Sequence, residues 1–267
     1  MSTLVCFHAH PDDEALSTGG LMAKASAAGH RVFVVCATKG ELGEPQPDVL
    51  EPGEELWERR VVELAESATV LGAEPPRFLE YEDSGMVDEP SNDNPKCFWQ
   101  ADVEEASQRL AAILTEIDAD VLTIYDDHGL YGHPDHIQVH RVGLRAAEIA
   151  GVANVYEATV NRDRALASMA EMSAEMEAAG VDGPSVDDFD EFGVEEDDLS
   201  YAVDVTGHLE AKRASMAVHR SQISDQSFFL YMPPERFATV FATEWFAVPG
   251  RAGTGGPEEV DLLPGLD

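Results

Sequence analysis

The sequence predicts a single α/β domain, with a mostly parallel, Rossmann-like sheet that carries helices on both faces. The first observation behind this prediction is the order of the elements. Short apolar runs of strand length alternate with longer segments of helical length through residues 4–158. The second is size, since 267 residues with 44% hydrophobic content are enough for one substantial core. No Gly-x-Gly-x-x-Gly pattern follows the first strand, so this fold class does not imply a dinucleotide cofactor.

The first elements form one strand-helix-strand unit. The apolar run 4–7 predicts a short buried strand, the segment 14–28 a helix, and the run 31–37 the second strand. Gly29 is typical of a helix end, because glycine readily adopts the left-handed conformation that closes helices. The segment 38–53 contains three prolines and follows a strand, so we expect a loop that borders a pocket.

The remaining elements follow the same signals. A helix at 54–71 stops before Gly72, and the His-Pro pair at 133–134 begins a helix that runs to residue 150. The further predicted strands are 77–81, 121–125, 154–158, 201–205 and 239–248, and the further predicted helices are 103–117, 165–179 and 209–221.

We expect one domain that spans residues 1–249 and contains an acidic insertion. The insertion, at about 181–198, has no lysine or arginine and many carboxylates, which is typical of an exposed surface segment. Residues 250–267 contain several glycines and prolines, and we expect them to form a flexible C-terminal tail.

The charge of the chain excludes several classes of partner. Lys and Arg number 17 against 52 Asp and Glu, which gives a formal net charge of -35. Nucleic acid and anionic membranes are polyanions, so we expect neither as a partner. No apolar run reaches the length of a membrane span, and no signal sequence opens the chain. The three cysteines, Cys6, Cys36 and Cys97, form no framework, so we expect a reducing, cytoplasmic location.

The first chemically distinctive stretch, Ala9-His10-Pro11-Asp12-Asp13-Glu14, directly follows the first strand. It places an imidazole and two carboxylates at the carboxyl end of a strand, where ligands and chemistry collect in α/β sheets. Zinc accepts His nitrogen and Asp oxygen, and a catalytic zinc needs three protein ligands and a water. The stretch therefore predicts about half of a metal site, although aspartates also cap helices and form turns.

A second stretch, Tyr131-Gly132-His133-Pro134-Asp135-His136, has the same character and follows the predicted strand 121–125. His133 and His136 are three residues apart at a helix start, so both can face one cavity. Two such clusters after parallel strands converge on one edge of the sheet, and together they predict a metal site more strongly than either alone. His140 lies one turn beyond His136, but three ligands are available without it.

These two stretches, and the spacing between them, resemble the PIG-L/LmbE-like zinc-dependent N-acetylglucosaminyl deacetylase family. The resemblance covers residues 3 to about 150 and includes Arg60 and the run Asp83-Ser84-Gly85-Met86. It implies an LmbE-like fold and a metal-dependent hydrolase that removes the N-acetyl group of an N-acetylglucosamine-type amino sugar conjugate. The family also includes the mycothiol-pathway deacetylase and the mycothiol S-conjugate amidase, so amidase-like C–N hydrolysis of a thiol-sugar conjugate is the alternative reaction.

The resemblance also implies how the metal and the proton carriers are arranged. His10, Asp13 and His136 would hold Zn2+, and Fe2+ suits a His/His/Asp set as well. Asp12 would be the general base that takes a proton from the metal-activated water, and His133 would protonate the departing amine.

Four further residues complete the implied site. Asp135 would orient or tune His133, and Tyr131 would help to stabilise the oxyanion. Arg60 and Asp83 would bind sugar hydroxyls, and the alternative for Arg60 is an ion pair with Glu63 on the helix surface. The expected partner is thus a small-molecule amino sugar conjugate, and the sequence leaves the oligomeric state open, a homo-oligomer included.

A third hypothesis is a non-catalytic metal- or sugar-binding protein. It is disfavoured by Asp12, because a site that only binds metal does not need a spare carboxylate beside its ligands. Among the other histidines, we expect His8 in the core and His128 in a solvated loop. His219 is expected to be either structural or a distal pocket residue.

Overall fold

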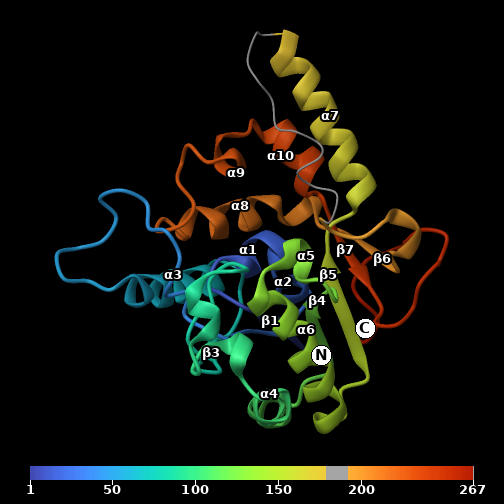
Figure 1. Ribbon diagram of the computed structural model, residues 1–267. Coiled ribbons are helices and arrows are strands. Elements are labelled where there is room, and N and C mark those ends of the chain that lie inside the picture. The colour runs from blue at the N-terminus through green and yellow to red at the C-terminus, as the bar shows by residue number, and fades with distance from the viewer. Residues whose placement is uncertain (179–191, 267) are drawn as a thin grey trace.

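The computed structural model describes residues 1–178 and 192–266, and these form a single sheet of eight strands (Figure 1). The strands lie in the order β3-β2-β1-β4-β5-β7-β6-β8. Their bounds are β1 Thr3–His8, β2 Arg31–Cys36, β3 Arg77–Phe78, β4 Val121–Tyr125, β5 Asn154–Thr159, β6 Tyr201–Asp204, β7 Thr243–Ala247 and β8 Glu258–Val260.

The sheet is mostly parallel, as predicted. β1 pairs in parallel with both β2 and β4, β3 extends the sheet beyond β2, and β5 extends it beyond β4. β7 is antiparallel to its two neighbours, β5 and β6, while β8 pairs in parallel with β6. β1 therefore lies in the interior of the parallel part, and its carboxyl end opens beside that of β4.

Helices cover both faces of the sheet, as the alternation of elements predicts. One face packs against α4 and α6, and the other against α2 and α3 (Figure 1). The helices are α1 Asp13–Ser17, α2 Gly19–Ala27, α3 Leu56–Val70, α4 Val103–Ile117, α5 Gly129–Gly132, α6 Pro134–Ala150, α7 Arg162–Ala178, α8 Leu209–Val218, α9 Phe228–Tyr231 and α10 Pro234–Phe241. α7 extends away from the sheet at the top of Figure 1.

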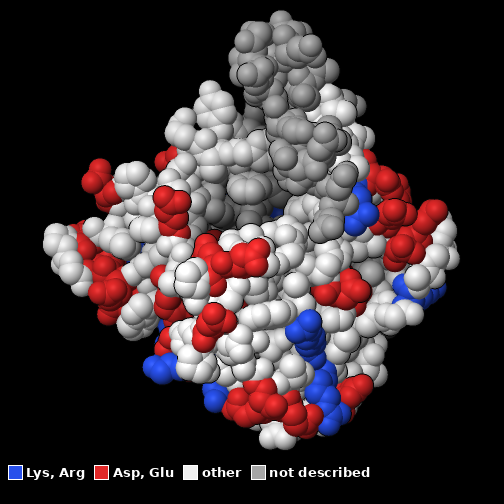
Figure 2. All heavy atoms as spheres, in the orientation of Figure 1, with Lys and Arg blue, Asp and Glu red and all other residues white. Residues whose placement is uncertain are grey.

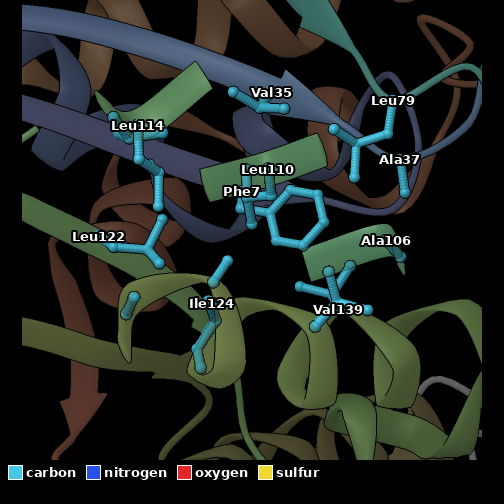
Figure 3. Close-up of a cluster of buried hydrophobic side chains, with 14 of the residues drawn as sticks. Phe7, Val35, Ala37, Leu79, Ala106, Leu110, Leu114, Leu122, Ile124 and Val139 are labelled. Carbon is cyan, nitrogen blue, oxygen red and sulfur yellow. The ribbon is translucent and has the colours of Figure 1, made fainter. Parts of the chain in front are cut away.

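The central strand is buried on both sides, which explains why it reads as a continuous apolar run. Val5 and Phe7 enter the core shared with α4 and α6, whereas Leu4 and Cys6 enter the core shared with α2 and α3. In Figure 3 the ring of Phe7 lies among side chains of the sheet and the helices, including Leu110 of α4. This packing fixes the position of β1, and with it the stretch that follows.

Three predicted elements differ from the structure. The helix expected at 14–28 is broken at Thr18, where α1 ends and α2 begins, and the carboxylate of Glu244 accepts the N–H groups of Gly20 and Leu21 in the first turn of α2. The strand expected at 239–248 is half helix, since α10 extends to Phe241 before β7 begins. The strand expected at 77–81 pairs only over β3.

The expectation of a flexible C-terminal tail at 250–267 does not hold for residues 258–266. Residues 258–260 form β8, which pairs with β6, and Leu263 and Leu266 are buried in the core beside α2 and α3. Glycines and prolines in this segment form turns between these anchored residues rather than a disordered chain.

The acidic insertion is described only in part, because residues 181–191 lie outside the described residues. The following part, 192–198, packs against the start of α7. The guanidinium of Arg162 donates to the carbonyl oxygens of Phe192 and Gly193, and the backbone of Asn161 forms an isolated parallel β-bridge with that of Val194.

The surface carries the acidic excess of the composition. On the face drawn in Figure 2, carboxylate side chains form several separate groups and basic side chains are fewer. Cys6, Cys36 and Cys97 are all buried and free, as small hydrophobic residues would be. Among the described residues, no helix combines the length and the apolar composition that crossing a bilayer requires.

Candidate metal and catalytic site

The two chemically distinctive stretches meet at the carboxyl ends of β1 and β4. The first forms the sharp turn from β1 into α1, and Asp12 at its centre has φ 113°, in the left-handed region that L-residues rarely adopt. Such a conformation costs about 1–3 kcal/mol and persists only where its surroundings enforce it. The second stretch begins α6, where Pro134 fits the first helical turn.

Three buried side chains converge on a common point between the stretches. The Oδ2 atom of Asp13 lies 3.5 Å from Nδ1 of His10 and 3.5 Å from Nε2 of His136. A tetrahedral site with bonds of ~2.0–2.1 Å separates its ligand atoms by roughly 3.4 Å. Two imidazoles and one carboxylate at these separations therefore fit a zinc-type ion, and the structure brings the three predicted ligands together.

The carboxylate of Asp135 selects which nitrogen of His10 is available. Asp135 is fully buried and lies 3.2 Å from Nε2 of His10, while the backbone N–H and the hydroxyl of Ser84 also donate to it. An ionised carboxylate only accepts hydrogen bonds, so Nε2 of His10 carries the proton and Nδ1 keeps its lone pair. The lone pair then faces Asp13, and such a carboxylate–histidine arrangement is typical of metal ligands.

Asp135 thus has a different partner from the one expected. Its carboxylate contacts His10 and Ser84, whereas its connection to His133 is through the backbone, whose N–H donates to Nδ1 of His133 over 3.1 Å. Because Nδ1 of His133 accepts this bond, the proton of the neutral ring is on Nε2. His133 therefore presents an N–H group to the site even when it is uncharged.

Burial and the neighbouring His10 lower the pKa of His133 to about 4. The ring centroid of His133 lies 4.7 Å from that of His10 and 5.1 Å from that of His136, so the three imidazoles form one group. A second imidazole-carboxylate set, made of His10, Asp83 and His133, shares this group.

His136 is held by aromatic neighbours. Its ring stacks on that of Tyr125 at 4.4 Å between centroids, and the Tyr125 hydroxyl bonds Nδ1 of His8 at 2.8 Å. His8 is therefore a buried supporting residue, as expected. The hydroxyl of Tyr131 lies 3.4 Å from Nε2 of His136, and the tyrosine is 46% exposed, so it borders the open side of the site.

Asp12 stands beside the three donors without belonging to them. It is the residue that caps α1, yet its side chain makes no capping bond, and its Oδ1 lies 3.2 Å from Nη2 of Arg60. Burial raises the pKa of Asp12 to about 6, and the charge of Arg60 opposes this rise. A carboxyl group with such a pKa can accept a proton near neutral pH and release it again.

Arg60 is buried rather than on the helix surface, so the alternative of a surface pair with Glu63 is wrong. Its guanidinium donates to the carbonyl oxygens of Gly40 and Pro11 in addition to its contact with Asp12. Glu63 instead accepts the backbone N–H and the hydroxyl of Ser221.

Asp83 reaches the same site from the segment after β3. Its Oδ1 lies 3.6 Å from Nε2 of His10, and its two oxygens accept the backbone N–H groups of Gly85 and Leu42. Burial alone would raise the pKa of Asp83, but His10 and these hydrogen bonds hold it below its usual value. Asp83 is therefore a fixed negative charge at the edge of the site.

Two histidines lie outside the donor group, as expected. Nδ1 of His140 bonds the carbonyl oxygen of Tyr125 at 3.0 Å and lies 3.3 Å from Glu157. His128 is partly exposed and pairs with Asp126 and Asp127 in its loop.

Sequence reasoning missed the residues that support the site from a distance. Ser84, Glu14 and Tyr125 are buried and bond the proposed site residues or their supports. The only signal for them was their position beside the motifs. His219 is placed by the structure against Glu14, so it is structural rather than a pocket residue.

The family model and the relatives that match this chain carry descriptions of the same kind, and together they cover most of its length. Residues 5–147 match the family model described as PIG-L, GlcNAc-PI de-N-acetylase. The 1D-myo-inositol 2-acetamido-2-deoxy-alpha-D-glucopyranoside deacetylase of Thermomonospora curvata is 41% identical over an alignment of 248 positions, gaps included. The alignment covers 83% of this chain and 82% of the relative. The deacetylase of the same name from Salinispora arenicola is 38% identical over an alignment of 281 positions, gaps included, which covers 98% of this chain and 91% of the relative.

Among solved structures, the N,N'-diacetylchitobiose deacetylase of Pyrococcus horikoshii superposes with a TM-score of 0.58. The match covers 93% of this chain and 84% of that one, at 24% identity, and at that identity it bears on the fold alone.

Proposed function

Because the chain belongs to the PIG-L family of GlcNAc-PI de-N-acetylases, we propose that it is a metal-dependent deacetylase of an N-acetylglucosamine-type amino sugar conjugate. The substrate that we propose is N-acetylglucosamine linked to myo-inositol, because this compound appears in the names of relatives that are 41% and 38% identical. The products are then acetate and the free amino sugar.

We propose that His10, Asp13 and His136 hold the metal. The donor set fits Zn2+, and Fe2+ takes the same ligand types. When bound, such an ion polarises a carbonyl oxygen and lowers the pKa of water towards neutrality. Asp135 contributes indirectly, because it keeps the proton of His10 on the nitrogen that faces away from Asp13.

Asp12 is the proposed general base. A water in the site loses its proton to Asp12 as it attacks the acetyl carbon, and the raised pKa of the carboxyl, about 6, suits this exchange. Arg60 keeps the carboxylate in place through its contact with Oδ1. The amine leaves only after it gains a proton, which must come from a second donor.

His133 is the proposed donor to the departing amine. Its Nε2 carries a proton in either charge state, because Nδ1 is occupied by the backbone N–H of Asp135. With a pKa of about 4 the resting imidazole is neutral, so its Nε2–H donates a hydrogen bond to the amide nitrogen, and His133 transfers a proton to the amine only from its imidazolium form. Tyr131 is proposed to donate to the carbonyl oxygen as negative charge develops on it.

The resemblance suggested Asp83 and Arg60 as sugar-binding residues, and we propose only Asp83 for this role, because its contacts favour it. Its carboxylate lies at the edge of the site, where it accepts sugar hydroxyl groups. Arg60 is buried and contacts Asp12, so we propose that it holds the base in place rather than bonding the sugar directly.

The single observation that carries this proposal is the position of Asp12. The carboxyl group of Asp12 is close enough to Asp13 and His10 for their charges to shift its pKa, it belongs to neither group of metal donors, and a buried guanidinium holds it. A protein that only binds metal or sugar has no use for this arrangement.

The direct test measures acetate and primary amine released from the inositol conjugate, from free N-acetylglucosamine and from a thiol-sugar amide conjugate. Metal content is determined on the same samples. We expect the highest kcat/KM for the inositol conjugate. Preferential cleavage of the thiol-sugar conjugate would favour the amidase, and no amide cleavage by the metal-loaded protein would refute the proposal.

A further inference from the structure

Glu14 is a fully buried carboxylate beside the site that the proposed chemistry does not use. Its Oε1 atom accepts the hydroxyl of Ser67 at 2.5 Å and lies 2.6 Å from Nε2 of His219. Its Oε2 atom accepts the backbone N–H of Asp12 at 3.0 Å. A buried carboxylate needs such partners. One of these partners is the backbone of Asp12, the residue that we propose as the base.

The backbone of Asp12 requires such a partner. Its φ of 113° is disfavoured for a residue with a side chain, so contacts with the surrounding chain must enforce it. The conformation sends the Asp12 side chain away from the capping position and towards Arg60. If the N–H of Asp12 lost its acceptor, the turn could relax and the carboxylate would leave the donors.

Both attachments of Asp12 lead to the same helix. Arg60 and Ser67 are seven residues apart on α3, which places them on one face of the helix. Arg60 contacts the carboxylate of Asp12 directly, and Ser67 reaches its backbone through Glu14. α3 therefore holds the side chain and the main chain of Asp12 at two separate points.

We propose that Glu14 is a positioning residue for the general base. It fixes the left-handed turn at Asp12, so that the Asp12 carboxylate stays beside the metal donors. This inference rests on the proposed function, in which Asp12 takes the proton from water. Glu14 touches neither substrate nor metal, and it acts on the rate only through Asp12.

The first test compares two variants of Glu14 with a control variant. The two Glu14 variants differ in whether residue 14 can still accept a hydrogen bond from the backbone N–H of Asp12. Glu14→Ala removes the acceptor, and we expect kcat to fall about 100-fold with KM and metal content unchanged, because misplacing a catalytic group by ~1 Å has an effect of this size. Glu14→Gln keeps an oxygen for the N–H of Asp12 and should stay within about fivefold of wild type. Ser107→Ala removes a buried hydroxyl that donates to the carbonyl oxygen of Val142 between α4 and α6, and it is the matched control with nearly unchanged kcat.

The second test separates positioning from a general structural role. In an Asp12→Ala background, Glu14→Ala should change the residual kcat by less than about twofold, because its only route to the reaction is gone. An equal loss in both backgrounds would overturn the proposal, as would a Glu14→Ala variant that keeps wild-type kcat. If Glu14→Ala does not fold, Glu14→Leu fills the volume without an acceptor and is measured in its place.

A structural readout keeps this inference distinct from the proposed function. If the wild-type protein deacetylates no amino sugar, the function fails, but a crystal structure of Glu14→Ala still tests the turn. We expect Asp12 to leave its positive φ and its carboxylate to leave Arg60. An unchanged Asp12 in that structure would overturn the positioning role whatever the activity.

Discussion

The two halves of the molecule contribute to the site in different ways. The first half, β1–β5 with α1–α6, supplies every proposed metal donor and proton carrier, from turns that follow β1 and β4. The second half, β6–β8 with α8–α10, supplies buried polar contacts that hold the first half. The comparison teaches that the chemistry of this site is local in the chain, whereas part of its buried polar support comes from residues about two hundred positions away.

The contacts of the second half are buried and charged. Lys212 of α8 pairs with Glu244 of β7 at 2.5 Å, and Glu244 also accepts the N–H groups of Gly20 and Leu21 at the start of α2. Carboxylates at a helix N-terminus stabilise its unpaired N–H groups. This one cluster therefore connects α8, β7 and α2.

Breaking the Lys212–Glu244 pair is expected to give the largest loss of stability. Lys212→Met leaves the Glu244 carboxylate buried without its cation, and removing one partner of a buried pair destabilises a protein by ~3–5 kcal/mol. Adding Glu244→Gln to Lys212→Met removes the unpaired charge but keeps one oxygen that can accept an N–H group of α2. The double variant should therefore recover part of the lost stability. Denaturant unfolding gives the free energy of unfolding of the single and the double variant.

The matched control is the pair Arg145–Glu104 in the first half, with a separation of 2.7 Å and side chains about half exposed. Exposed pairs contribute ~0–1 kcal/mol, so Arg145→Met should change the free energy of unfolding by less than about 1 kcal/mol. Equal losses from Lys212→Met and Arg145→Met would remove the distinction between the two halves.

The C-terminal segment gives the next largest expected effect. Leu263 is completely buried beside the core residues of α2 and α3, so Leu263→Ala should destabilise the protein by ~2–5 kcal/mol through lost burial and a cavity. Leu42 is half exposed in the loop after β2, and Leu42→Ala serves as the surface control. A negligible effect of Leu263→Ala would restore the flexible tail that the sequence alone suggested.

A smaller effect is expected in the pH dependence. Burial raises the pKa of Asp12 to about 6 and the positive charge of Arg60 opposes it, so activity should fall as the pH drops and Asp12 becomes protonated. The positive charge of a bound divalent cation would lower the pKa of Asp12, as the charge of Arg60 does. Arg60→Met removes one opposing charge, and the acidic limb of kcat/KM should move to higher pH by about one unit. A limb that moves to lower pH would contradict Asp12 as the base.

The sequence predicted the first half closely because its signals are local. The bounds of α4 and β4 agree with the periodic runs that predicted them, and both motifs lie at strand ends where the alternation placed them. The two motifs predicted where a metal site lies, and the resemblance to the family selected the three proposed donors among their residues.

The second half was predicted less well because its structure depends on distant partners. The strand expected at 239–248 contains β7 but also the end of α10, and β8 was not predicted because it forms through its pairing with β6. Likewise, nothing near Glu14 in the sequence indicates that its partners are Ser67 and His219. The resemblance assigned Asp135 to His133, but its carboxylate contacts His10 from the other motif.

The central claim is that Asp12 is a base beside the metal rather than a ligand to it. The most direct measurement is acetate release by Asp12→Asn, with metal content determined on the same sample and His136→Ala as the ligand control. We expect Asp12→Asn to keep its metal and to lose turnover by ~10²–10⁴-fold, the usual contribution of a general base, whereas His136→Ala loses both. Near-normal turnover by metal-loaded Asp12→Asn would contradict the account.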